Sequence, residues 1–390
     1  MMFENKRAFV AGAGAMGQGI AQVFAQAGWN VWLFDNRPNA AAQAKLSVAS
    51  ALDKLVAKGK MEFALADEVK SRIHTATSLQ DAAKASLFIE AVIEDLDVKK
   101  NLFAEVESIV SQSAVLATNT SSLSVTSIAS VCAHPGRVVG IHFFNPAPLM
   151  PLVEVIPAIQ TAEGLALRIA DEVKAWGKIP VVAKDTPGFI VNRLARPYYG
   201  ESLRILEEGI ADIPSIDHAL KSIGGFRMGP FELMDLIGND VNYTVSETVW
   251  SQFYYDPRYR PSLIQRRMKE AGFLGKKSGR GYYDYAEQAT NPGPSGDEQI
   301  WNLVFMRVIS MLVNEAAEAL LLGVASASAL DLAMTKGVNY PKGLLAWGDE
   351  IGPERILACL DNLQSKYGDD RYRASSLLRE RVASGKPLFG

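Results

Sequence analysis

One histidine of the 390-residue chain stands where it could do acid–base chemistry. His142 lies near the end of a β-rich run, 138–144, which is followed by a proline-punctuated loop, 145–151. Glu154 lies inside the next apolar run, 152–156. Two strands that reverse around such a loop can place these residues side by side. A buried carboxylate is costly unless it is paired. The pattern therefore predicts a His–Glu pair, either a base with the acid that orients it or a structural hydrogen bond.

A second motif lies close to the N-terminus. The run Gly12-Ala13-Gly14-Ala15-Met16-Gly17 fits G-x-G-x-x-G, follows a strand pattern and opens a helix pattern. Glycines there allow a tight turn and a close approach of the backbone to a pyrophosphate, which then faces the helix N-terminus. In this context the motif predicts a dinucleotide site at Gly12, Gly14, Ala15, Met16 and Gly17.

Asp35, 18 residues after Gly17, ends the next strand pattern. A carboxylate at this place accepts hydrogen bonds from the adenosine ribose and repels a 2′-phosphate, so NAD is the expected cofactor. Arg37 could instead meet a 2′-phosphate, which keeps NADP as the alternative.

The elements that must position these residues alternate in the first ~185 residues, as in a Rossmann-like α/β domain. Helices are expected at 16–27, 40–58 and 98–110, the second being long and alanine-rich, an insertion between Arg37 and Lys60. The expected strands span 7–11, 30–35, 73–77, 87–93, 114–119, 137–144, 152–156 and 178–183. Together they predict a mostly parallel sheet with helices on both faces.

After Pro187 the strand signal ends and helices are expected, with a Pro/Gly-rich break at 291–296. The region repeats itself at a spacing of 114 residues. The repeated residues are Glu201, Leu206, Gly209, Asp217, Ala219, Gly229, Asp235, Ile237 and Gly238, against Glu315, Leu320, Gly323, Asp331, Ala333, Gly343, Asp349, Ile351 and Gly352. This predicts one helical module in two copies. The expected domains are 1–185, 186–290 and 291–390.

Composition excludes several classes of protein. A net charge of −3 argues against a chain that coats nucleic acid or an anionic membrane, and no apolar run is long enough to span a bilayer. Charged residues in Met1–Arg7 argue against a signal peptide. Cys132 and Cys359 lack metal-ligand spacing, so we expect two buried thiols, no metal and a cytoplasmic location.

Several blocks together resemble the 3-hydroxyacyl-CoA dehydrogenase family. They are 118–123 (TNTSSL), 142–146 (HFFNP), 152–155 (LVEV), 185–193 (DTPGFIVNR), 229–233 (GPFEL) with Gly238, and 279–283 (GRGYY). The resemblance runs in order from residue 7 to about 285. The layout with two helical copies resembles the dehydrogenases of phenylacetate degradation, which act on 3-hydroxyadipyl-CoA. The sequence does not determine the acyl chain of the substrate, and short 3-hydroxybutyryl-CoA is among the alternatives.

The resemblance implies residue roles. His142 would take the proton of the 3-hydroxyl while hydride leaves C3 for the nicotinamide, and Glu154 would orient and stabilise the imidazole. Ser121 and Asn192 would hydrogen-bond the reacting oxygen or the thioester carbonyl. Further positions match cofactor contacts of the family, namely Glu94, Lys99, Ser121, Asn145 and Lys277.

Other interpretations stay open. Ser121 could only cap a helix, and Asn192 could only pack. Lys54 and Lys58, with Lys60, could meet the CoA phosphates or form a solvated face. The enzyme could act on a small hydroxy acid or sugar, or the chain could bind a nucleotide without catalysis. Shorter relatives pair their helical modules in a homodimer, so the second copy is expected to replace the twin within a monomeric chain, with a homodimer as the alternative.

Overall fold

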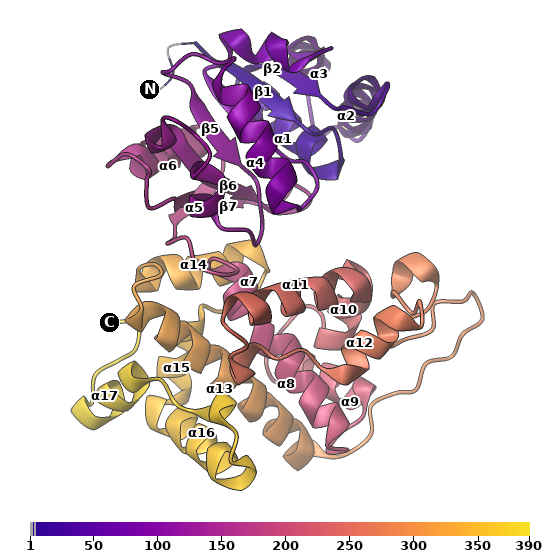
Figure 1. Cartoon of the computed structure of the whole chain (residues 1–390). Helices are drawn as coiled ribbons and strands as arrows, with labels where there is room; N and C mark the ends of the chain where they lie inside the picture. The colour runs from indigo at the N-terminus through magenta and orange to yellow at the C-terminus, as the bar shows by residue number, and fades with distance from the viewer. Residues whose placement is uncertain (1–2, 4) are drawn as a thin grey trace. The chain divides into compact units, whose positions relative to one another are not determined.

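The structure, a computed structural model, describes residue 3 and residues 5–390 and divides them into two compact units, Met1–Phe189 and Ile190–Gly390 (Figure 1). Part of the expectation for the charged N-terminus falls on positions 1, 2 and 4, outside the described residues. Within the described ranges, no helix is both long and apolar enough to cross a membrane.

The first unit contains one eight-stranded sheet in the order β3-β2-β1-β4-β5-β6-β7-β8. Its strands are β1 (Arg7–Ala11), β2 (Asn30–Phe34), β3 (Ile73–Thr75), β4 (Leu87–Glu90), β5 (Val115–Thr118), β6 (Val138–Phe143), β7 (Leu152–Pro157) and β8 (Ile179–Val182). Every neighbouring pair is parallel except β6–β7, which is antiparallel. All eight expected strands are present, most of them a residue or more shorter at one or both ends. The expected mostly parallel sheet is confirmed.

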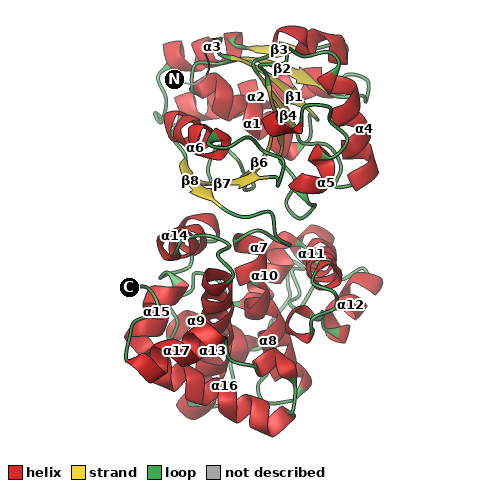
Figure 2. Cartoon of the chain, turned by 60° about the vertical axis from the view of Figure 1, so that its left-hand side comes forward, coloured by secondary structure: helices red, strands yellow, loops and turns green. Residues whose placement is uncertain are grey.

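Helices cover both faces of the sheet, as Figure 2 shows. One face carries α1 (Ala15–Gln26), α2 (Ala40–Ala57), α3 (Phe63–Ser71) and α6 (Leu165–Ala175). The other carries η1 (Leu79–Lys84), α4 (Leu96–Glu107) and α5 (Val125–Ala129), and a short turn, η2 (Pro135–Arg137), precedes β6. Neighbouring residues of β1 divide between the two cores: Val10 packs with the first group of helices and Phe9 with the second.

The expected long helix of the insertion is present as α2, which ends one residue before the predicted end. The insertion between β2 and β3 also contains a second helix, α3, that was not predicted. The chain leaves α2 through Gly59, whose φ of +65° is a left-handed conformation that ends helices. Helix α2 buries the stripe Ala41, Ala44, Val48 and Leu52, and it packs against α1 and α3.

The second unit is all-helical and contains the same module twice. The first copy comprises α7 (Val191–Leu194), α8 (Arg196–Glu207), α9 (Ile213–Ser222), α10 (Pro230–Ile237), α11 (Asn239–Gln252), η3 (Pro257–Tyr259), α12 (Leu263–Glu270) and η4 (Lys276–Ser278). The second comprises α13 (Glu298–Leu321), α14 (Ala327–Gly337), α15 (Leu344–Ile351), α16 (Pro353–Tyr367), η5 (Asp370–Tyr372) and α17 (Ser376–Ser384). Elements α8 to α12 thus recur in order as α13 to α17, which confirms the repeat.

The repeated residues have a physical reason to recur. In the first copy the buried Asp217 accepts hydrogen bonds from two backbone amides in the first turn of α10, at 2.9 and 3.0 Å. In the second copy Asp331 does the same for α15, at 2.8 and 3.0 Å. Each helix is preceded by a glycine, Gly229 or Gly343, where a Cβ would lie 2.2 Å from the aspartate carboxyl. The aspartate cap therefore requires the glycine.

A second aspartate closes each copy. Asp235 accepts the backbone amides of residues 282 and 283, at 3.0 and 2.9 Å. Asp349 accepts those of residues 388 and 389, at 2.6 and 2.9 Å. The last residues of the chain thus occupy, in the second copy, the place that the 279–283 block has in the first.

Buried ion pairs join the two copies reciprocally. Arg193 of the first copy pairs with Glu315 of the second, and Arg307 of the second pairs with Glu201 of the first. The two arginines are 114 residues apart, and so are the two glutamates. Such an exchange of partners is the signature of a two-fold interface, here between two halves of one chain.

The cysteines correct one expectation. Cys132 is buried, but Cys359 is only partly buried, because it lies on α16, which buries little beyond Ile356 and Leu360. Burial raises the pKa of the Cys132 thiol to about 11.

Candidate active site

The strand pair β6–β7 brings His142 and Glu154 together. The two residues lie directly opposite each other in the antiparallel register. The imidazole Nδ1 is 2.7 Å from Glu154 Oε2, and Glu154 is completely buried. An ionised carboxylate can only accept, so beside it the Nδ1 of a neutral imidazole donates and Nε2 carries the lone pair. This is the geometry of a base held by an acid.

Apolar rings surround the imidazole. The ring of Phe144 lies 4.5 Å from it, centroid to centroid, and that of Phe189 lies 5.9 Å away. His142 is itself only 5% exposed. The adjacent residue Phe143 donates its backbone N–H to Asn119 Oδ1 at 2.9 Å, which ties the end of β6 to the end of β5.

Ser121 lies on the loop that follows β5. Its backbone N–H donates to Glu94 Oε1 at 2.8 Å, and the Thr120 hydroxyl donates to the same oxygen at 2.7 Å. Burial opposes the charge of Glu94, but Lys99 and these hydrogen bonds outweigh it and lower its pKa. Glu94 therefore holds the loop that carries Ser121 as a carboxylate.

Lys99 is 1% exposed and lies beneath this loop. Its Nζ contacts both oxygens of Glu90, at 2.8 and 2.7 Å, and lies 3.3 Å from Glu94. Thr118 also donates its hydroxyl to Glu90. Lys99 thus faces two carboxylates of the protein, and any contact with a cofactor would have to be made through Glu94.

The glycine-rich turn fits a dinucleotide. Gly12 has a φ of +102°, and a Cβ at this residue would lie 2.4 Å from the carbonyl oxygen of Ala91. A Cβ at Gly17 would lie 1.7 Å from the carbonyl oxygen of Gly12. A Cβ at Gly14, by contrast, would have no other atom within 4 Å. Gly14 also precedes α1, which has no side-chain cap. The first amides of α1 therefore face open space that a pyrophosphate can fill.

Asp35 follows β2. It accepts the Ala13 backbone amide at 2.8 Å and two hydrogen bonds from the Arg37 guanidinium, both 2.9 Å. The hydrogen bond with Arg37 lowers the pKa of Asp35 to about 2. Burial opposes this effect less strongly, and the Ala13 amide adds to the lowering. Arg37 is thereby engaged by the carboxylate, although its side chain is 67% exposed.

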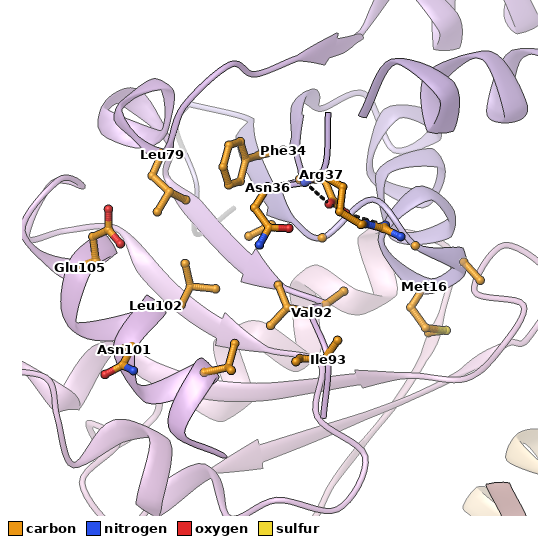
Figure 3. Close-up of a pocket in the computed structure, with 17 residues that line it drawn as sticks. Met16, Phe34, Asn36, Arg37, Leu79, Val92, Ile93, Asn101, Leu102 and Glu105 are labelled. Carbon is orange, nitrogen blue, oxygen red and sulfur yellow. Dashed lines mark hydrogen bonds and ion pairs between the residues drawn. The ribbon is translucent and has the colours of Figure 1, made fainter. Parts of the chain in front are cut away.

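A pocket of about 880 Å³ opens at this turn (Figure 3). Gly12, Gly14, Asp35 and Arg37 line it together with residues 91–93 after β4. The far wall was not predicted from the sequence, because it comes from distant segments; it consists of Leu79, Val98, Asn101, Leu102 and Glu105. The pocket thus lies over the carboxyl ends of β1, β2 and β4, where open α/β sheets bind nucleotides.

The remaining predicted residues lie elsewhere. Asn145 is exposed after β6, and Lys54 and Lys58 are exposed at the end of α2. Two belong to the second unit: Asn192 lies in α7, and Lys277 lies in η4 with its Nζ 2.6 Å from Asp240.

Sequence reasoning missed Glu90, which is completely buried at the end of β4. The signal was available, since an acid inside the apolar run 87–90 needs a partner just as Glu154 does. The resemblance instead assigns its partner Lys99, nine residues on, to the cofactor.

Comparison with known proteins identifies the chain's relatives. The family model described as "3-hydroxyacyl-CoA dehydrogenase, NAD binding domain" matches residues 7–186, and the family's C-terminal domain matches 188–285 and again 304–387. The chain belongs to the 3-hydroxyacyl-CoA dehydrogenase family. The expectations of an NAD cofactor and of a hydroxyacyl-CoA oxidoreductase are confirmed at this level.

Two curated relatives differ in length. The 3-hydroxyadipyl-CoA dehydrogenase of Escherichia coli is 37% identical and covers 98% of each chain. A probable 3-hydroxybutyryl-CoA dehydrogenase of Deinococcus radiodurans is 41% identical and covers 99% of its own chain but 71% of this one. Among solved structures, the Escherichia coli 3-hydroxybutyryl-CoA dehydrogenase is 36% identical with a TM-score of 0.92, over 98% of this chain and all of the other.

Proposed function

We propose that this protein oxidises (3S)-3-hydroxyacyl-CoA thioesters to 3-oxoacyl-CoA with His142 as the base. The observation that carries the proposal is the 2.7 Å contact between His142 Nδ1 and Glu154, which leaves Nε2 for the substrate. Nε2 takes the proton of the 3-hydroxyl as the C3–O double bond forms. NAD, when bound, accepts the hydride from C3. Glu154 stabilises the imidazolium that results, and the surrounding phenyl rings exclude water.

Ser121 and Asn192 hold the substrate in this proposal. Asn192 can donate a hydrogen bond to the C3 oxygen or to the thioester carbonyl, and Ser121 can do so once its hydroxyl turns away from Glu94 Oε1, to which it donates at 3.2 Å. Such donors are most valuable where charge develops. Glu94 supports Ser121 by fixing its loop.

Cofactor binding is assigned to the glycine turn and its surroundings. Gly12, Gly14, Ala15, Met16 and Gly17 would accommodate the pyrophosphate, and Asp35 would accept the adenosine ribose hydroxyls. Glu94, Ser121, Asn145 and Lys277 are proposed as further contacts, with Lys99 supporting them through Glu94.

For the CoA end we propose Lys54 and Lys58, whose exposed ammonium groups suit the CoA phosphates. For the acyl end we propose that 3-hydroxyadipyl-CoA is among the substrates. The relative that covers 98% of this chain, duplicated module included, carries that name.

We further propose that the chain is a monomer in which the second helical copy replaces a dimer partner. The reciprocal Arg–Glu pairs support this, and so does the match of the shorter relative to only 71% of the chain. Domain limits near residues 185 and 290 are part of the same proposal. The two free cysteines support a cytoplasmic location.

The test is turnover. The protein should oxidise NADH with acetoacetyl-CoA and reduce NAD with (3S)-3-hydroxybutyryl-CoA and 3-hydroxyadipyl-CoA, and His142→Ala should abolish both reactions while NADH still binds. Activity on a free hydroxy acid or sugar but not on the thioesters would refute the substrate class. NADH binding without any turnover would identify a non-catalytic relative instead.

A further inference from the structure

Asn192 is followed in α7 by an arginine that is bound to the other helical copy. Arg193 Nε lies 2.6 Å from Glu315 Oε1, and the two side chains are 2% and 0% exposed. Glu315 lies in α13, which packs against α7. A buried charge that loses its partner is strongly unfavourable, so this pair fixes where α7 lies along α13.

Glu315 is the centre of a larger cluster. The Tyr259 hydroxyl donates to Glu315 Oε1 at 2.6 Å, and Arg258 Nη1 approaches Oε2 at 3.5 Å. Both residues come from η3 of the first copy. One carboxylate of the second copy therefore holds α7 and η3 of the first.

Helix α7 is a short turn with neighbours on both sides. It has four residues and no side-chain N-cap, and it continues through Ala195, whose backbone is helical, directly into α8. On the side of the second copy it packs against α13 and α14. The Arg193–Glu315 pair is a buried ion pair that links this turn to the second copy.

We propose that Glu315, in the second helical copy, is a positioning residue for the reaction: through Arg193 it fixes α7 and so places the Asn192 amide. This inference rests on the proposed role of Asn192 in holding the substrate. It gives the duplicated module a part in turnover besides covering the first copy.

The chain contains its own matched control. The second reciprocal cluster has Arg307 Nη2 and Glu201 Oε1 each 2.8 Å from the Tyr372 hydroxyl, and Arg307 is also bound by Glu208. The residue before Arg307 is Met306, 114 residues after Asn192, and methionine has no amide to place. Breaking this cluster disturbs the same interface without reaching a proposed substrate contact.

The experiment compares Glu315→Gln with Glu201→Gln. For acetoacetyl-CoA reduction at saturating NADH we expect kcat to fall roughly 10- to 100-fold in Glu315→Gln, the usual effect of misplacing a contact by about 1 Å, and to stay within about threefold in Glu201→Gln. The NADH Kd should be unchanged in both. Equal losses of kcat in the two variants would overturn the inference.

A double-mutant cycle with Asn192→Ala separates positioning from general damage. If Glu315 acts through Asn192, adding Glu315→Gln to Asn192→Ala should lower kcat by no more than about twofold. A loss as large as in the wild-type background would overturn the inference while leaving the proposed function intact. Full activity of Asn192→Ala alone would instead refute the proposed role of Asn192, and the inference with it.

If Glu315→Gln does not fold, a pair of milder substitutions tests the inference. Tyr259→Phe removes one hydrogen bond from Glu315, and Tyr372→Phe removes the equivalent one from Glu201. We expect only Tyr259→Phe to lower kcat, and only in a chain that retains Asn192; equal effects would overturn the inference.

Discussion

At the scale of single residues, the sheet determines the chemistry of His142. Glu154 faces it across paired strands rather than from a loop, so backbone hydrogen bonds on both sides hold the distance between the two side chains. The acid selects the tautomer, because the nitrogen that it faces must carry the hydrogen. A change of that acid should alter turnover without altering cofactor binding.

The first prediction concerns Glu154→Gln. The amide keeps the size of the acid but loses its charge and can donate to Nδ1, which favours the tautomer with a protonated Nε2. We expect kcat to fall about 10²- to 10⁴-fold, the range for loss of general-base catalysis, while the NADH Kd stays within twofold. Steady-state kinetics and a fluorescence titration measure the two quantities. The exposed Glu163→Gln is the control, and a kcat for Glu154→Gln equal to the control's would contradict the assignment.

The second prediction concerns cofactor choice. Asp35→Ser removes the carboxylate and frees Arg37, so NADH should bind about tenfold more weakly and NADPH more tightly. Titrations with both cofactors give the ratio of the two affinities, with Asp53→Ser, an exposed position of α2, as the control. An unchanged ratio would refute the role of Asp35. Because its pKa is lowered to about 2, the carboxylate stays charged from pH 8 down to pH 5, and its contribution to the NADH affinity should be constant over that range.

At the scale of elements, the two helical copies depend on the same cap, an aspartate packed against a glycine. The third prediction tests it with Gly343→Ala, whose methyl group would collide with Asp331. We expect the free energy of unfolding to fall by about 1–3 kcal/mol. The control is Gly200→Ala within α8, where nothing lies within 4 Å and alanine should stabilise by about 0.5–1 kcal/mol. Urea unfolding measures both, and a neutral Gly343→Ala would show that the cap can yield.

The fourth prediction concerns the pH dependence of stability. Burial, opposed by hydrogen bonds from two amides and the Tyr283 hydroxyl, raises the pKa of Asp217 to about 7 from an ordinary value of 3.8. The folded state therefore keeps a proton that the unfolded state loses. The stability from this group is complete below pH 3.8 and is lost as the pH rises to about 7.

Relative to Asp217→Asn, the wild type should lose about 3 kcal/mol between pH 4 and pH 7 and little more above it. Urea unfolding of both proteins across this range measures the difference. A difference that is constant with pH would mean that Asp217 is ionised throughout.

Local sequence determines much at this scale. Each strand could be placed from a short run of β-branched and apolar residues, and the His142–Glu154 contact followed from two adjacent strands. The repeat predicted the doubled module because identical contacts need identical residues. By contrast, the second helix of the insertion, α3, the Glu90–Lys99 pair and the far wall of the pocket depend on packing between different elements. The resemblance assigns Lys99 to the cofactor, and only the structure shows that Glu90 is its buried partner.

At the scale of the whole molecule, the reciprocal pairs Arg193–Glu315 and Arg307–Glu201 make the helical unit a two-fold assembly within one chain. In the proposed monomer, the second copy covers the surface through which the first copy would pair with a twin. The fifth prediction is that the protein is a monomer of 42.4 kDa at micromolar concentration. Sedimentation or light scattering measures the mass, and a tight dimer joined through the first copy would contradict it.

The fusion of the two copies has a genetic consequence. In a symmetric homodimer every substitution at the interface appears on both sides, so neither side can change alone. Here each codon contributes one residue to the interface instead of two. The sequences of the two halves can therefore diverge while the contacts between them persist. Two differences of this kind are Met306 at the position equivalent to Asn192 and Leu344 at the position equivalent to Pro230. One half is free to lose the residues of a working site, provided that it keeps the arginine and the glutamate that its other half needs.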